Sequence, residues 1–283
     1  MNKSRRFQWE IYVTLTLVAI IMLTPLAWMV LTSLKSFADV LADPPQWLPR
    51  RLQWDNYATV MREFAFHRFF VNSAFVTGMV LVGTVISCCS AAYAFVFLDV
   101  PYRHAIFAVL LSALMLPGQV TIIPLFKFFT SIGWINTYYP MIVPAWLGGN
   151  IFGIFLLRQF FLTIPRSYIE AARMDGASEL TILWRIVVPM STPVIMTVVV
   201  FTFLGSWNDL FSPLIYLHDE RLYTLPVGLL YFVAQTQVMG GGSGVPWHLV
   251  MALATVMVLP IITVFFLAQK HFIEGIASAG VKG

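Results

Sequence analysis

Charged side chains are scarce in this sequence of 283 residues, because Asp, Glu, Lys and Arg together make up only 11% of the chain. Soluble domains contain roughly 25% charged residues. Hydrophobic residues make up 59%, and the mean hydropathy is +0.81. A chain of this composition cannot cover its own surface with polar groups in water. We therefore predict an integral membrane protein.

The sequence also lacks the patterns that accompany catalysis. No phosphate-binding loop of the form G-x-x-x-x-G-K-[ST] occurs, and the nearest imitation, residues 78–84, lacks the lysine and lies in an apolar run. No carboxylate pair, nucleophile–His–Asp set or His/Cys cluster stands out, and the five histidines are dispersed. We predict that the chain is not an enzyme and holds no cofactor or metal of its own.

The placement of the cysteines and of the positive charges gives no sign of a disulfide-stabilised protein or of a nucleic-acid-binding protein. The two cysteines, Cys88 and Cys89, are adjacent in an uncharged run, so we do not expect them to form a structural disulfide or a metal site. They read as small residues that face either lipid or a neighbouring helix. The net charge of +4 comes from scattered basic residues, which does not indicate nucleic-acid binding.

Long apolar runs are what the sequence has instead. A helix needs about 20 mainly apolar residues to cross a bilayer, because its backbone must satisfy its own hydrogen bonds there. Residues 105–157 are too long for one crossing and contain turn-forming Gly133, Asn136 and Pro140, so we divide them into two helices. The sequence thus predicts an all-α membrane protein with about six transmembrane helices, in runs 11–31, 69–98, 105–157 (two), 186–208 and 249–269.

Six crossings place both termini on one side of the membrane. Lys3, Arg5 and Arg6 precede the first apolar run, which is too long for a signal-peptide core. Basic residues are moderately enriched in the segments on the same side as the termini, so we predict cytoplasmic termini in a bacterial-type inner membrane. The expected parts are a cytoplasmic N-terminus (1–8), the transmembrane domain (9–271) and a cytoplasmic tail (272–283).

Two loops differ from the rest. Residues 33–68 read as a proline-stiffened stretch followed by a short surface helix in WDNYATVMREF. Residues 222–237 are apolar, but Pro226 and Gly228 interrupt them, so we expect a partly embedded outer segment there and no seventh crossing.

Residues 168–189, YIEAARMDGASELTILWRIVVP, interrupt the apolar chain with charge. Ser167 and Glu170 have the spacing of a capping box, Gly176 suits the left-handed position that ends a helix, and Ser178 suits an N-cap. Leu180, with Leu183 and Trp184, makes one helix face apolar. We expect a helix–Gly–helix unit on the cytoplasmic surface, which either lies on lipid or docks into a groove on a partner.

The same stretch resembles the EAA loop of ATP-binding-cassette (ABC) importer permeases, whose pattern is EAA, three residues, Gly, nine residues, Ile, one residue, Leu, Pro. Val188 stands where that pattern has Leu. Residues 206–217, SWNDLFSPLIYL, and the tail 269–283 resemble permeases of the carbohydrate-uptake type, the group that includes the maltose-transporter permease MalG. The resemblance implies the type I importer (MetI-like) fold. The residues that it assigns to coupling, within a loop at about 162–189, are Glu170, Ala171, Ala172, Asp175, Gly176, Ile186 and Pro189.

The resemblance also implies partners. It predicts a second permease (as a heterodimer), two ABC ATPase subunits that hold ATP and Mg, and an extracytoplasmic solute-binding protein. The implied function is ATP-driven import of a sugar, oligosaccharide or polyol, with the EAA loop docked on the ATPase and the C-terminal tail reaching the ATPase dimer.

Polar residues inside or beside the spans are candidates for the solute pathway. Asn208 and Asp209 follow Trp207 at the end of the fifth run, where they offer hydrogen bonds and a ring face suited to sugar. The full set of candidates is Gln119, Asn150, Trp207, Asn208 and Asp209.

A self-sufficient secondary transporter or channel is the alternative. Such proteins use intramembrane ionisable residues for ion coupling and show repeated halves. Here Lys127 is nearly the only charge within a run, and the halves show no repeat.

Overall fold

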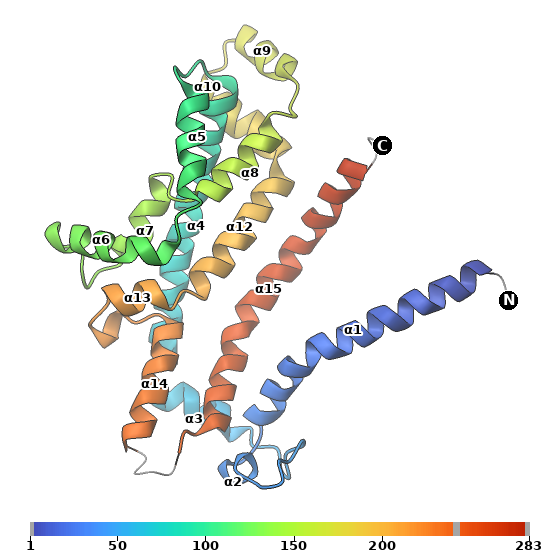
Figure 1. The fold of residues 1–283 in the computed structure, drawn as a ribbon, viewed down its shortest axis with the longest axis vertical. Helices are drawn as coiled ribbons and strands as arrows, with labels where there is room; N and C mark the ends of the chain where they lie inside the picture. The colour runs from blue at the N-terminus through green and yellow to red at the C-terminus, as the bar shows by residue number, and fades with distance from the viewer. Residues whose placement is uncertain (1–2, 240–243, 281–283) are drawn as a thin grey trace. The chain divides into compact units, whose positions relative to one another are not determined.

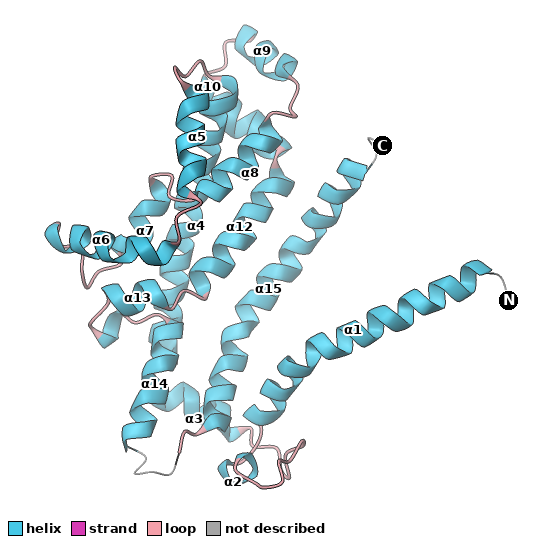
Figure 2. Ribbon diagram, viewed as in Figure 1, coloured by secondary structure: helices cyan, strands magenta, loops and turns pink. Residues whose placement is uncertain are grey.

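The computed structural model describes the backbone of residues 3–239 and 244–280 and the side chains of 9–62, 64–118, 120–237 and 244–270. Within these residues every regular element is helical and no strand occurs (Figure 2), as the sequence predicts. The chain divides into two compact units, residues 1–67 with 228–260, and residues 68–227 with 261–283.

The first unit contains α1 (Lys3–Ser33), α2 (Phe37–Val40), the predicted surface helix α3 (Asp55–Glu63) and most of α14 (Leu225–Met239). Asn56 of α3 donates from Nδ2 to the carbonyls of Ser33 and Lys35 at 2.8 and 2.9 Å, which satisfies orphan groups at the end of α1. The Lys35 ammonium lies 4.1 Å from the centre of the Trp28 ring and donates to the Gln46 carbonyl. Burial lowers the pKa of Lys35, and nearby Asp39 opposes that shift.

Residues 222–237 fall largely in α14, which is one unbroken helix. Pro226 stands in its first turn, where the missing N–H costs no helical hydrogen bond. Pro226 therefore does not break the segment as the sequence suggested. The glycine-rich residues 240–243 lie outside the described part of the chain.

The second unit holds the bundle that positions the candidate site. It is built around α4 (Phe66–Phe97), with α5 (Arg103–Ala113), α6 (Gly118–Ser131), α7 (Tyr139–Trp146), α8 (Ile151–Phe161) and α12 (Thr192–Trp207). Figure 1 shows α4, α5, α8 and α12 running along one another, with α9 (Arg166–Met174) and α10 (Glu179–Ile182) at one end of them.

Among the residues that the structure describes, four helical stretches are long and apolar enough to cross a membrane: Trp9–Ser33, Phe66–Phe97, Tyr139–Phe161 and Trp247–Lys270, the last within α15 (Trp247–Gly280). The helices Glu179–Met190 and Thr192–Trp207 pass the same test as a pair but meet at a bend of 85°. The chain is therefore a multi-pass membrane protein with four such spans, or five if the bent pair is one span.

The third of the six expected crossings is not a continuous helix. The turn predicted around Gly133 and Asn136 is confirmed, because α6 ends at Ser131, α7 begins at Tyr139, and both turn residues have a positive φ. A second break separates α5 from α6. Pro117 has an extended ψ of 130° and cannot donate a backbone hydrogen bond, so neither helix alone has the length of a span.

One hydrophobic core joins the bundle helices to the charged insert. Its members come from α4, α8, α9, α10, α12 and the segments between them, and they are buried together. They are Cys88, Cys89, Ala92, Tyr93, Val96, Ile154, Leu157, Phe161, Ile164, Ile169, Ala172, Ile182, Leu183, Val187, Ile195 and Val198. Both cysteines are free, as predicted, and both are buried against neighbouring helices.

Gly153 lets α8 approach α4 and α12 closely. A Cβ at this position would meet Cys88 Sγ and Val198 Cγ1, both at 3.1 Å. By contrast, a Cβ placed on Gly78, in α4, would have no other atom within 4 Å.

We expect Gly153→Val to lower the free energy of unfolding by about 1–3 kcal/mol, because overpacking forces neighbouring helices apart. The measurement is the thermal midpoint of the purified protein in mild detergent. Gly78→Val is the matched control and should have little effect. Equal midpoints for the two variants would contradict the packing described here.

Candidate functional site

The charged insert folds as a chain of short helical pieces. After α9 come Gly176, α10, a π-helical turn η1 (Leu183–Val187) and α11 (Val188–Met190), which leads through Ser191 into α12. We call residues 166–190 the coupling loop, after the role that the sequence resemblance predicts for them. Gly176 has φ +78°, as predicted, and its N–H donates to the Arg173 carbonyl at 3.0 Å.

The caps of these helices agree with the sequence at one of two positions. Ser178 is the N-cap of α10, where its Oγ accepts from the backbone N–H of Thr181 at 3.3 Å. The predicted capping box of Ser167 and Glu170 is wrong. Helix α9 begins at Arg166, two residues before the start that a Ser167 N-cap requires, and Pro165 at its N-cap has no side-chain acceptor.

Helix α9 has one buried and one exposed face. Ile169 and Ala172 are 2% and 8% exposed and belong to the core. Tyr168, Ala171 and Met174, spaced three residues apart, are exposed on the other side, with Met174 at 89%. The helix is thus attached to the bundle by one face and presents a second apolar face outward.

The predicted coupling residues divide between these environments. Glu170, Ala171, Asp175, Gly176 and Pro189 are exposed. Ala172 is buried in the core, and Ile186 is half-buried against it. The predicted coupling residues 170–176 lie together in α9 and the turn that ends it. Ile186 and Pro189 lie further along the chain, in η1 and α11.

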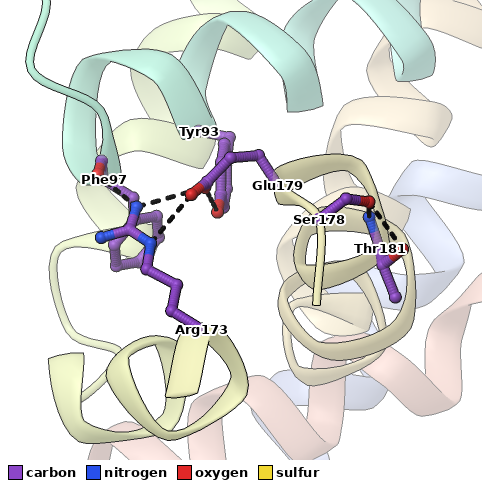
Figure 3. Close-up of polar contacts among 6 residues, drawn as sticks. All are labelled: Tyr93, Phe97, Arg173, Ser178, Glu179 and Thr181. Carbon is purple, nitrogen blue, oxygen red and sulfur yellow. Dashed lines mark hydrogen bonds and ion pairs between the residues drawn. The ribbon is translucent and has the colours of Figure 1, made fainter. Parts of the chain in front are cut away.

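A polar network fastens the coupling loop to α4 (Figure 3). The Arg173 guanidinium donates from Nε to Glu179 Oε1 at 2.8 Å and from Nη2 to Glu179 Oε2 at 3.1 Å. Arg173 Nη2 also donates to the Phe97 carbonyl at 3.0 Å, and the Tyr93 hydroxyl donates to Glu179 Oε2 at 2.5 Å. The hydrogen bond to Glu179 raises the pKa of Arg173 above its ordinary value.

A cavity of about 660 Å³ lies in the same unit, between α4, the α5–α6 and α7–α8 junctions, α12 and α13 (Phe211–Tyr216). This volume is in the range of small-molecule sites. Apolar side chains form much of its wall. The polar and charged side chains that line it are Ser73, Thr77, Thr84, Asn150, Thr202, Ser206, Asp209, Ser212 and Thr224.

Two of the five predicted pathway residues line this cavity. Asn150 caps α8 by accepting from the Gly153 N–H at 2.8 Å, and its Nδ2 donates to Thr202 Oγ1 at 3.0 Å. Asp209 accepts from the Ser212 N–H at 3.1 Å. Both polar groups are therefore held in defined orientations at the cavity wall.

Of the other three, Trp207 and Asn208 are not among the residues that line it. Trp207 is 3% exposed and stacks on Phe203 at 5.5 Å, so its ring presents no free face to a sugar here. Asn208 Nδ2 donates to the Leu204 carbonyl of its own helix. Gln119 is in α6, and its side chain lies outside the described residues.

Sequence reasoning found Asp209 but missed every serine and threonine that lines the cavity. Thr202, Ser206 and Asp209 are spaced by four and then three residues in or just after α12, and Ser206 Oγ donates to Thr77 Oγ1 of α4 at 3.2 Å. Polar residues at three- and four-residue spacing in an apolar helix share one face. That spacing is the signal that could have identified them. Thr224 Oγ1 is buried without a hydrogen-bond partner among the described residues.

No group of three or more His, Cys, Asp or Glu side chains that could hold a metal ion occurs among the residues that the structure describes.

We expect a cysteine placed on the cavity wall to be reachable by a polar, membrane-impermeant thiol reagent. Gly205 lines the cavity with open space around its Cβ position, so Gly205→Cys should be labelled. The first control is Gly78→Cys, which has similar space but does not line the cavity, and it should react slowly. The second control is the wild-type protein, which should also react slowly because its two cysteines, Cys88 and Cys89, are buried. Equal labelling of Gly205→Cys and Gly78→Cys would contradict a water-filled cavity.

Comparison with known proteins gives the family. Residues 83–278 match the binding-protein-dependent transport system inner membrane component. The chain is 33% identical over 291 residues to the probable ABC transporter permease protein YurM of Bacillus subtilis, covering 100% of this chain and 92% of YurM. It is 29% identical over 269 residues to the trehalose/maltose transport system permease protein MalG of Thermococcus litoralis, covering 94% of each.

A solved structure supports the same assignment. The chain matches one from the crystal structure of a bacterial ABC transporter involved in the import of the acidic polysaccharide alginate. The TM-score is 0.82 at 25% identity, and the match covers 96% of this chain and 99% of that one. The predicted type I importer permease (MetI-like) fold is confirmed. The chain therefore belongs to the family of binding-protein-dependent transport system inner membrane components.

Proposed function

We propose that this chain is the permease subunit of an ATP-driven importer of a sugar, oligosaccharide or polyol, and that residues 166–190 couple it to a cytoplasmic ATPase. Its relatives include a trehalose/maltose permease and a chain of an alginate importer, which both serve carbohydrates. The chain itself is a membrane permease component. ATP and Mg are held by partner ATPase subunits.

The observation that carries the proposal is the outward face of α9. Tyr168 and Met174 are 54% and 89% exposed, although both are large and apolar. Glu170 is exposed beside them and forms no hydrogen bond or ion pair with the described residues. A short amphipathic helix with such a face fits a groove on a partner, where small Ala171 permits close approach.

The opposite face of α9 explains how docking acts on the bundle. Ile169 and Ala172 are packed into the core with Phe161 of α8 and Val96 of α4. A protein core is close-packed and transmits displacement. Movement of the ATPase therefore reaches the spans through this core.

The partners follow from this role. A second permease completes the translocation path, two ATPase subunits grip the coupling loops, and an extracytoplasmic binding protein delivers the solute. The orientation that fits these partners has the coupling loop and both termini in the cytoplasm of a bacterial-type cell.

The solute path would include the cavity described above. Asn150 and Asp209, together with the hydroxyls of Thr202 and Ser206, offer both donors and acceptors, which suits the hydroxyl groups of a carbohydrate. Trp207 and Asn208 have a weaker claim, because they do not line this cavity. Gln119 stays a prediction, because its side chain lies outside the described residues.

We expect Gly176→Pro to abolish solute uptake while membrane insertion and basal ATP hydrolysis remain. Proline cannot adopt φ +78° and lacks the N–H that donates to the Arg173 carbonyl, so α9 would lose its attachment to α10. The solute is first identified as the carbohydrate that stabilises the cognate binding protein in a thermal-shift screen of mono-, di- and oligosaccharides. The measurement is then the uptake of this carbohydrate by the reconstituted complex.

Gly133→Pro is the matched control, since Gly133 also has a positive φ, of 72°, but lies between α6 and α7, outside the coupling loop. It should strain the chain comparably and retain ATP-dependent uptake. Normal uptake by Gly176→Pro would count against coupling through residues 166–190.

A further inference from the structure

Three segments that are distant in sequence meet at the network of Figure 3. Arg173 comes from the last turn of α9, Glu179 from the first turn of α10, and Tyr93 with the Phe97 carbonyl from the final turns of α4. Both carboxylate oxygens of Glu179 are occupied by the bidentate guanidinium, and one also accepts from Tyr93. A bidentate pair of this kind fixes orientation as well as distance.

The contact with Phe97 has a further physical basis. Phe97 is the last residue of α4, so its carbonyl is one of those that the helix leaves without an internal partner. A cation at this end is favoured by the helix dipole. Arg173 therefore satisfies the end of α4 and the carboxylate of α10 at the same time.

The network is too exposed to serve mainly as a source of stability. The side chains of Arg173 and Glu179 are 41% and 42% exposed, and solvent screens ion pairs of this kind so that they add little to folding. What the four contacts do is hold α9, α10 and α4 in one arrangement.

Helix α4 extends from this network to the cavity. It runs without proline or break from Phe66 to Phe97, and Val80 and Thr84 on it line the cavity. At 1.5 Å per residue, Val80 lies about 20 Å along the helix from Tyr93. By contrast, the covalent path from α10 into α12 passes a π-helical turn and an 85° bend.

We infer that Arg173, Glu179 and Tyr93 form a strut that transmits movement of the coupling loop to α4, and through α4 to the cavity wall. They are positioning residues, because none of them contacts the cavity. The inference rests on the proposed function, since it presumes that an ATPase moves the loop.

The test measures the response of the cavity wall to nucleotide and requires no knowledge of the solute. Val80→Cys is introduced into the full complex, and its rate of modification by an impermeant methanethiosulfonate is compared without nucleotide and with ATP trapped by vanadate. The strut is then weakened with Tyr93→Phe or Glu179→Gln. We expect each variant to reduce the nucleotide-dependent change in rate by about threefold or more, since each removes a hydrogen bond in a charged network.

Ser178→Ala is the matched control. It removes a cap in the same loop, where Ser178 Oγ contacts Thr181 Oγ1 at 2.9 Å, without touching α4 (Figure 3). It should retain the wild-type change in labelling. Thermal midpoints of all variants in detergent identify any that fail to fold, and Tyr93→Phe, which loses a single hydroxyl, is expected to fold.

The outcomes separate the two levels of the account. If the strut variants respond to nucleotide as fully as Ser178→Ala, the strut is refuted and the proposed function stands. If the complex with intact Arg173, Glu179 and Tyr93 shows no nucleotide-dependent change at all, coupling to ATP itself is refuted, and the inference falls with it.

Discussion

The hydrophobic core shared by α4, α8, α9, α10 and α12 is the interaction on which the rest of this structure depends. The hydrophobic effect does not drive helices together in lipid, so the packing of the spans depends on close contact. Gly153 permits this contact by bringing α8 within reach of Cys88 and Val198. The same core accepts Ile169 and Ala172 from the charged insert. Because those residues pack against the spans, the charged insert is an integral part of the helix bundle and not a flexible loop attached to it.

Two kinds of contact therefore hold the coupling loop, and they act differently. Apolar burial fixes α9 against the bundle but does not define its direction closely. The bidentate contact of Arg173 with Glu179, extended to Tyr93 and the Phe97 carbonyl, defines the angle between α9, α10 and α4. The outward face of α9 is left free to bind a partner. A loop built in this way can be gripped on one side while it moves the helices on the other.

The sequence predicted what depends on local chemistry. Gly176 and Ser178 were correctly assigned, because left-handed backbone and an N-cap each have strong residue preferences. The prediction of a capping box at Ser167 failed, because the N-cap of α9 is Pro165, two residues before the predicted one. The all-helical fold followed from the apolar runs. The prediction of the third crossing as one continuous helix failed, because hydropathy alone does not reveal the helix break at Pro117.

Long-range contacts were beyond the sequence. Nothing in the pattern pairs Tyr93 with Glu179, which are 86 residues apart, and nothing distinguishes buried Trp207 from Asp209 at the cavity. Asn150 and Asp209 were found because polar groups in apolar segments stand out. Thr77 and Thr202 were overlooked because a threonine can bond to its own helix and so carries little signal by itself.

The most direct test of the account is the composition of the complex. The chain would be purified from its native host in mild detergent, and every stoichiometric partner would be identified by mass. The account predicts a nucleotide-binding subunit and a second permease in the purified complex. A homo-oligomer without any ATPase would contradict it and would make residues 166–190 a hairpin on the lipid surface of a self-sufficient transporter.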